Sequence, residues 1–244
     1  TSLPEAPISA GSMSTASVMP AVKASAEAAV QNLIAQAVGD SASPLHGVRP
    51  EDVDFRNGRL SLRSSPEKGE DHAAVVRRYG QPVEGVAHTK PQLNPKTDPC
   101  HSFRAVFAEV ALDPDFGMTR VRRVVAVYDV GRIVNRKTAE SQFIGGIIWG
   151  VGLALQEVTH FDWRYGRPVN SNLADYHVPV NLDIGSIEVS ALDIPDYKLD
   201  SIGARGVGEI GITGTSAAIA NAVFHATGNR VRDMPITPDK LVTS

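Results

Sequence analysis

The sequence predicts an α+β fold in which mixed, largely antiparallel sheets pack against helices. Two hairpin patterns carry this prediction. Asn57-Gly58 separates two short strand-like segments, and the turn-forming residues 113–117 separate the apolar runs 103–112 and 119–130. Helical segments surround these hairpins without the regular strand–helix alternation that a parallel α/β fold requires.

The helical segments follow from hydrophobic periodicity. In residues 16–38, apolar side chains recur at three-to-four spacing, and Gly39 supplies the stop. Pro20 is tolerated there only in the first turn of the helix. Further helices are expected at residues 70–79, 137–158 and 215–227. Additional short strands are expected around residues 159–170 and 185–194, and the proline-rich residues 81–100 are expected to form an irregular connection.

Size and composition are those of a soluble globular protein. The chain has 244 residues with a formal net charge of −3, so neither a nucleic-acid partner nor a polybasic membrane surface is indicated. The most apolar stretch, residues 143–158, is shorter than the roughly 20 residues that span a bilayer, so no membrane insertion is expected. Cys100 is the only cysteine, which excludes an intramolecular disulfide. Because the chain does not begin with methionine, we expect a processed chain or a piece of a longer polypeptide, either a fragment or one part of a split subunit.

A glycine-rich segment, residues 203–215, holds a single carboxylate, Glu209, among five glycines just before the last helix. Glycine at this density lets the backbone pass close to a bulky ligand, and burial would raise the pKa of a carboxyl group there toward the working pH. The alternative is a tight strand-to-helix connection whose glutamate faces water. The local sequence favours neither interpretation.

Two other patterns are weaker. Gly206-x-Gly208-x-x-Gly211 matches the dinucleotide-binding fingerprint, but no convincing second parallel strand follows, so a nicotinamide-dependent dehydrogenase is only a third hypothesis. The histidines are scattered without the spacing of a zinc site, so no protein ligands for a metal are expected.

Two polar features have both a functional and a structural interpretation. Residues 11–17 place hydroxyl and N–H groups at the start of the first helix, where they would bind an anion or cap the helix. Gln142 could bind the edge of a heterocycle with its amide, or could be a surface residue.

Taken together, these segments resemble the molybdenum hydroxylase family of xanthine dehydrogenases and aldehyde oxidoreductases. The resemblance is strongest from Ser102 to Leu241, with residues 11–22 as an outlying match. The segments that carry it, in the order of the family, are residues 124–135, 142–152, 172–176, 187–189 and 203–209. The resemblance implies the C-terminal part of a molybdopterin-binding large subunit. Residues 1–100 would form a part with the cofactor loop, a helix and a hairpin, and residues 101–244 a part with the catalytic glutamate loop.

The resemblance also implies a reaction and a site. The reaction is hydroxylation of an aldehyde or N-heterocycle with water as the oxygen source, and Glu209 is the implied general base. The cofactor is molybdenum–molybdopterin, in bacteria often as the cytosine dinucleotide, and the protein gives the metal no side-chain ligand. The implied cofactor contacts are Gly11, Ser12, Ser14, Thr15, Ser17, Gln142, Gly206, Val207 and Gly208. Arg205 would orient the substrate or temper the pKa of Glu209, or else be a solvated loop charge.

A full large subunit of this family is longer, so this chain is expected to be inactive alone. Its implied partners are the rest of the large subunit, iron–sulfur and flavin subunits, and a small-molecule substrate. Cys100 alone cannot ligate an iron–sulfur cluster, so that cluster and FAD would be held by partner subunits. Such enzymes fold in the cytoplasm, and some are exported to the periplasm afterwards. The competing hypothesis is a non-catalytic cofactor-binding or assembly module of the same fold.

Overall fold

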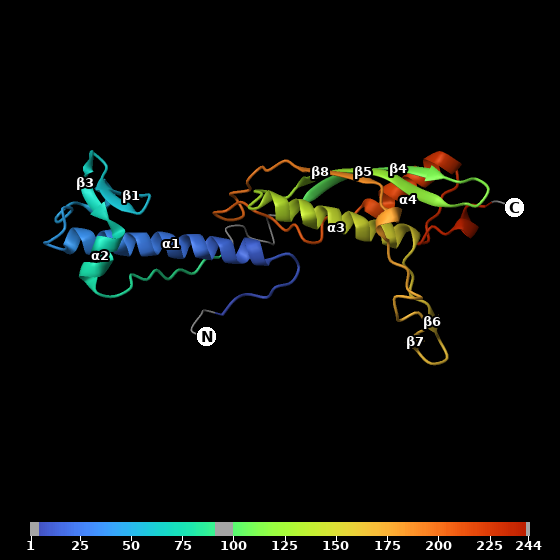
Figure 1. Cartoon of the computed structure of the whole chain (residues 1–244), viewed down its shortest axis with the longest axis horizontal. Coiled ribbons are helices and arrows are strands. Elements are labelled where there is room, and N and C mark those ends of the chain that lie inside the picture. The colour runs from blue at the N-terminus through green and yellow to red at the C-terminus, as the bar shows by residue number, and fades with distance from the viewer. Residues whose placement is uncertain (1–4, 91–99, 243–244) are drawn as a thin grey trace. The chain divides into compact units, whose positions relative to one another are not determined.

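The computed structural model describes residues 5–90 and 100–242 and divides the chain into two compact units (Figure 1). The first unit comprises Thr1–Ala6 and Ser17–Pro91, and the second comprises Pro7–Ala16 and Gln92–Ser244. Residues 11–16 of the segment that was expected to contact the cofactor therefore belong to the second unit.

The first unit packs helix α1 (Ser14–Gly39) and helix α2 (His72–Tyr79) against a three-stranded antiparallel sheet. Its strands are β1 (Val53–Arg56), β2 (Arg59–Leu62) and β3 (Ser65–Asp71). The predicted hairpin is confirmed, because β1 pairs with β2 and both turn residues, Asn57 and Gly58, have positive φ. The core is formed by Leu33, Ile34, Ala37, Leu45, Val53, Leu60 and Val75.

Two details of this unit differ from expectation. The second helix begins at His72, because Glu70 and the following residue pair with β2 as part of β3, a strand that was not predicted. The first helix begins two residues before its expected start, so Pro20 lies beyond the first turn, where its missing N–H removes a helical hydrogen bond.

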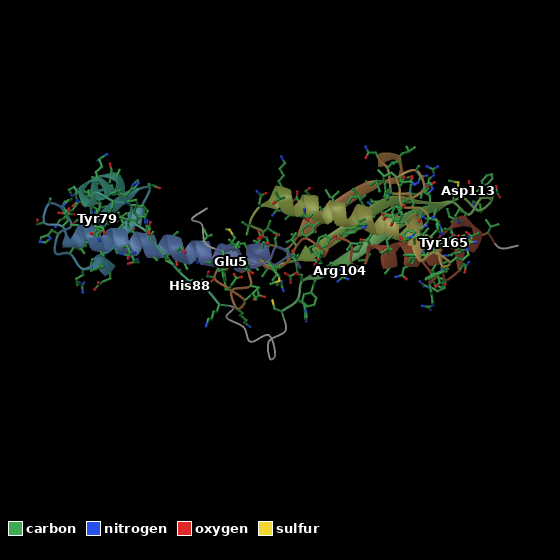
Figure 2. The ribbon with its side chains drawn as sticks, turned by 90° about the horizontal axis from the view of Figure 1, so that it is seen from below. Glu5, Tyr79, His88, Arg104, Asp113 and Tyr165 are labelled. Atoms are coloured by element: carbon green, nitrogen blue, oxygen red, sulfur yellow. The ribbon has the colours of Figure 1, made fainter. Side chains whose placement is uncertain are left out.

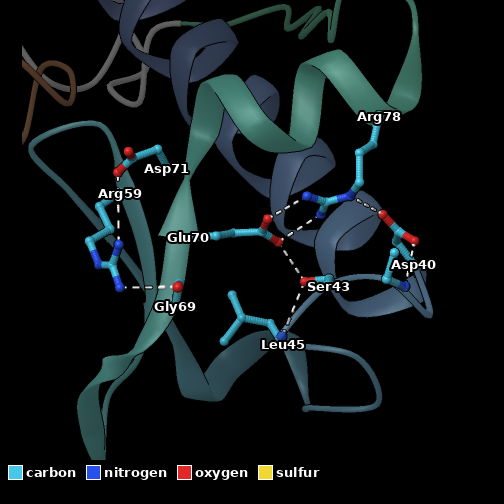
Figure 3. A network of polar contacts seen from close by, with 9 residues as sticks. Asp40, Ser43, Leu45, Arg59, Gly69, Glu70, Asp71 and Arg78 are labelled. Carbon is cyan, nitrogen blue, oxygen red and sulfur yellow. Dashed lines mark hydrogen bonds and ion pairs between the residues drawn. The ribbon is translucent and has the colours of Figure 1, made fainter.

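A polar cluster holds α2 against the rest of this unit (Figure 3). The guanidinium of Arg78 donates to both carboxylate oxygens of Glu70, at 2.6 and 2.8 Å, and its Nε donates to Asp40 at 2.6 Å. The Ser43 hydroxyl donates to Glu70 at 2.5 Å. These contacts lower the pKa of Glu70, with the hydrogen bonds from Arg78 as the largest cause. The buried carboxylate is thus kept charged and paired.

The second unit is built on a three-stranded sheet in the order β4–β5–β8. Strand β4 (Phe103–Leu112) pairs antiparallel with β5 (Thr119–Asp129), which confirms the predicted long hairpin, and β8 (Ser186–Ala191) adds to β5 in parallel. The parallel addition explains why the sheet is mixed. The small hairpin β6 (Phe161–Asp162) and β7 (Arg167–Pro168) lies apart from this sheet, with Tyr165 in its turn (Figures 1 and 2).

Helices α3 (Arg136–Leu155) and α4 (Thr215–Thr227) complete the second unit, and α4 has the bounds expected from sequence. Alternate residues of β5 point into the core, because a strand turns successive side chains to opposite faces. Tyr128 of β5 stacks on Phe143 of α3 with ring centroids 4.0 Å apart. Short 3-10 helices lie at Pro50–Asp52, Asn181–Asp183 and Pro238–Lys240.

None of the described helices combines the length and apolar character needed to cross a membrane.

Candidate active site

The glycine-rich loop of residues 203–214 is fastened at both ends to the core of the second unit. At its start, Ala204 forms an antiparallel bridge with Gly131, and the Arg205 N–H donates to the Val130 carbonyl at 2.8 Å. At its end, the buried Thr215 begins α4, and its hydroxyl donates to the Gly211 carbonyl at 3.1 Å. The loop therefore runs between the end of β5 and the start of α4.

The middle of the loop is held by Ser12, which lies 195 residues earlier in the chain than Val207. The Ser12 oxygen accepts hydrogen bonds from the N–H of Val207 at 2.8 Å and of Gly208 at 2.7 Å. From another side, the Ser102 hydroxyl donates to the Gly206 carbonyl at 3.1 Å. The three residues that precede Glu209 are thus fixed by side chains from two distant segments.

Helix α3 packs its backbone directly against the end of this loop. A Cβ atom added at Gly146 would lie 2.6 Å from the Gly211 Cα, and one at Gly150 would lie 2.6 Å from the Cβ of Thr215. The absence of a side chain at Gly146 thus admits the backbone of the loop, and at Gly150 it admits the side chain of Thr215. By contrast, nothing lies within 4 Å of a Cβ added at Gly145.

The same helix brings Gln142 to the loop. A Cβ built on Gly208 would lie 3.8 Å from the Gln142 Oε1 and 3.3 Å from the Ser12 Oγ. The structure thus brings together three of the expected cofactor-binding segments around one exposed glycine. Since Gly208 has no side chain, its backbone is open to a ligand at the point where an amide and a hydroxyl converge.

Glu209 follows immediately, and its side chain is exposed in this chain. Its carbonyl accepts a hydrogen bond from the Thr213 hydroxyl at 3.3 Å. The described residues therefore present the carboxylate at the surface and do not bury it. A dry pocket around Glu209 therefore requires groups other than those of the loop itself.

Among the contacts described within the second unit, Gly11, Ser14 and Thr15 form no hydrogen bond to the loop. Gly11 precedes Ser12 with a φ of 58°, and the Ser14 hydroxyl donates to Ser9 at 3.2 Å. Thr15 is exposed, and Ser17 belongs to the first unit. The roles of these four residues at a cofactor stay predictions.

Arg205 is tied into the fold. Its side chain is only 11% exposed and forms ion pairs with Asp129 and, at 3.8 Å, with Asp196. Its Nη1 also donates to the His101 carbonyl at 2.5 Å. The alternative of a solvated loop charge is therefore wrong, because the guanidinium anchors the loop. A role in orienting the substrate stays a prediction that these contacts do not support.

Sequence reasoning missed two residues that shape the loop, Ser102 and Arg104. The Nε of Arg104, on β4 (Figure 2), donates to the Thr213 carbonyl at 2.7 Å. Isolated polar residues in an apolar strand pattern give no local signal for such a role. Only the packing of β4 beside α4 brings these side chains to the loop.

The dinucleotide interpretation of the same glycines is not supported. A nucleotide-binding unit needs a second parallel strand after the helix that the glycines open. In the described residues after α4, 228–242, the structure has a 3-10 helix and no strand.

The groups that meet at Gly208 suit a cofactor that is bound through a polar edge. They are an amide, a hydroxyl and glycine backbone, which donate and accept hydrogen bonds but are poor ligands for a metal ion. Within residues 5–90 and 100–242, no group of three or more His, Cys, Asp or Glu side chains could hold a metal ion.

The chain is similar to known proteins in both sequence and fold. The family model described as "Molybdopterin cofactor-binding domain" matches residues 1–185. The aldehyde oxidoreductase molybdenum-binding subunit PaoC of Escherichia coli K12 is 51% identical over 141 residues, which are 58% of this chain and 19% of that subunit. The match therefore covers about a fifth of the length of this curated relative.

Solved structures share the fold. Quinoline 2-oxidoreductase from Pseudomonas putida 86 matches with a TM-score of 0.74 at 26% identity, over 88% of this chain and 28% of its own. Reconstituted CO dehydrogenase from Oligotropha carboxidovorans matches with a TM-score of 0.80 at 22% identity, over 96% of this chain and 29% of its own. These matches confirm the predicted α+β architecture.

Proposed function

Because this chain belongs to the family of molybdopterin cofactor-binding domains, we propose that it forms part of a molybdenum hydroxylase that oxidises an aldehyde or an N-heterocycle with water as the oxygen source. The observation that supports this proposal most is the meeting of Ser12, Gln142 and Gly208 directly before Glu209. The Gln142 amide, which would bind the cofactor, and the Ser12 hydroxyl thus lie against the loop that carries the carboxylate proposed as the base.

Each residue has a role that follows from its chemistry. When bound, molybdenum–molybdopterin would supply the two-electron oxidation that no protein side chain provides. The Gln142 amide offers two donors and one acceptor to the polar edge of the pterin. Gly206, Val207 and Gly208 allow their backbone to approach the cofactor closely, and the neighbouring hydroxyl of Ser12 shapes this stretch.

Glu209 would act as the general base that removes a proton from the oxygen derived from water. A carboxylate does this well when desolvation raises its pKa toward the working pH while it stays charged. Since Glu209 is exposed in this chain, that desolvation must come from the substrate and from the rest of the large subunit. The proposal therefore includes the remaining part of the large subunit as a partner.

Further parts of the proposal rest on the family. The cofactor would be in the cytosine dinucleotide form, and iron–sulfur and FAD groups on partner subunits would remove the electrons. Folding would occur in the cytoplasm, with export to the periplasm as an alternative. The chain alone would be inactive, because its match covers only about a fifth of the length of the curated relative.

The exposure of Glu209 also favours a second candidate, a module of the same fold that binds the cofactor or assembles with the other subunits without performing catalysis. The two candidates differ in one measurement. Turnover by the assembled subunit depends on the Glu209 carboxylate only if the loop is catalytic.

The test is Glu209→Gln in the assembled enzyme, with Glu188→Gln on β8, another exposed glutamate, as the matched control. We expect Glu209→Gln to retain molybdenum and pterin but to lose turnover by about 100-fold or more, the usual contribution of a general base. The control should keep both. Retention of more than about a tenth of the wild-type rate by Glu209→Gln would remove the general-base assignment.

A further inference from the structure

We propose that Ser12 is a positioning residue for the catalytic loop: its hydroxyl oxygen holds residues 206–208 in the conformation that presents Glu209. This inference rests on the function proposed above for Glu209. It gives Ser12 a different task from the direct cofactor contact expected from sequence.

The hydrogen-bond capacity of Ser12 carries the inference. A serine hydroxyl has two acceptor lone pairs and one proton to donate. Two donors, the N–H groups of Val207 and Gly208, lie 2.8 and 2.7 Å from the oxygen. The oxygen is therefore saturated as an acceptor, and toward a cofactor Ser12 can only donate its proton. Its main bonds are made to the loop.

The backbone conformation of Ser12 is consistent with a residue that is held in place by its contacts with the loop. Ser12 has a φ of 56°, in the left-handed region that non-glycine residues rarely adopt. Such a conformation persists where surrounding contacts hold it in place. The Ser12 side chain lies against bare backbone, since a Cβ added at Gly206 would be 3.2 Å from the Ser12 Cβ.

The glycine content of the loop explains why residues 206–208 need hydrogen bonds from a side chain to hold one conformation. Glycine loses more conformational freedom on ordering than any other residue, and two of the three residues before Glu209 are glycines. Ser102 fixes the carbonyl of Gly206, and Ser12 alone among the described side chains bonds to the two N–H groups that directly precede Glu209. Removing that oxygen would free both groups and let Glu209 move.

The experiment compares Ser12→Ala, Ser12→Asn and Ser9→Ala in the assembled holoenzyme. Ser12→Ala removes the acceptor. Ser12→Asn restores a carbonyl acceptor on a residue that tolerates positive φ. Ser9→Ala is the matched control, because Ser9 is exposed and its hydroxyl bonds to Ser14, not to the loop.

Hydrogen exchange of the peptide that contains residues 206–209 is measured together with molybdenum content, kcat and KM. For Ser12→Ala we expect exchange to rise and kcat to fall, each by about tenfold or more, since one lost hydrogen bond corresponds to a factor of about ten and two are lost here. KM and molybdenum content should stay near wild type. Ser12→Asn should recover part of both losses, and Ser9→Ala should match wild type.

Two results would overturn the inference. If exchange of the loop is unchanged in Ser12→Ala, Ser12 does not hold it. If molybdenum content falls while loop exchange stays at the wild-type value, Ser12 contacts the cofactor instead. Exchange of a β5 peptide serves as the check on folding. The exchange measurement does not depend on turnover. It therefore still tests whether Ser12 holds the loop if Glu209→Gln keeps its activity and the proposed function fails.

Discussion

The close contact between α3 and the loop predicts opposite effects for two neighbouring glycines. Gly145 and Gly146 both lie inside α3, so replacing either by alanine removes the same helix penalty of about 0.5–1 kcal/mol. A methyl group at Gly145 meets nothing within 4 Å, whereas one at Gly146 would lie 2.6 Å from both the Gly211 Cα and the Ile212 nitrogen. Backbone atoms cannot swing aside as a side chain can.

The magnitude follows from these contacts. Gly145→Ala should stabilise the second unit by about 0.5–1 kcal/mol through the helix term alone. Gly146→Ala gains the same term but forces the helix and loop apart, and overpacking of this kind costs about 1–3 kcal/mol. The two variants should therefore differ by about 1–3 kcal/mol in the free energy of unfolding, because the helix term cancels in the comparison.

Urea unfolding followed by near-ultraviolet circular dichroism measures this difference. The stack of the buried Tyr128 on Phe143 lies in the second unit and contributes to this signal only while that unit is folded. In the assembled enzyme, Gly146→Ala should also lower turnover, since Gly211 is only two residues beyond Glu209. Equal stability of the two variants would refute the reasoning, because it would mean that helix and loop are not in contact at Gly146.

Three further predictions concern the polar groups. Folding lowers the pKa of Glu70, so its pairing with Arg78 stabilises the first unit above the ordinary glutamate pKa of 4.5 and is lost as pH falls through the lowered value. Acid unfolding by circular dichroism should show this loss in wild type but not in Glu70→Gln, and identical acid profiles would contradict it. Gln142→Ala should lower molybdenum content of the assembled enzyme, measured by elemental analysis, and full metal occupancy would count against the pterin contact. Arg205→Lys should lower the melting temperature, because lysine cannot reproduce the fork that bonds Asp129 and the His101 carbonyl together. An unchanged melting temperature in calorimetry would show that this anchor is dispensable.

Local patterns were sufficient for most of the secondary structure. The hairpin at Asn57-Gly58, the long β4–β5 hairpin and the bounds of α4 depend on turn residues and on hydrophobic periodicity, both of which are written in adjacent residues. Strand β3 was not predicted because its residues are mostly polar. Its pairing with β2 and the ion pair of Glu70 with Arg78 form only after the chain has turned back on itself.

The same distinction between local sequence patterns and long-range packing applies to the candidate site. Sequence by itself determined which chemical groups are present: one carboxylate in a glycine loop, an amide on a glycine-containing helix, and hydroxyls near the start of the chain. Only the tertiary structure decided which of them meet. Ser12 reaches the loop across 195 residues while Thr15 stays exposed, and Arg205 turns inward to Asp129. Residue type fixes what a group can donate or accept, but long-range packing of the backbone sets the distances over which it does so.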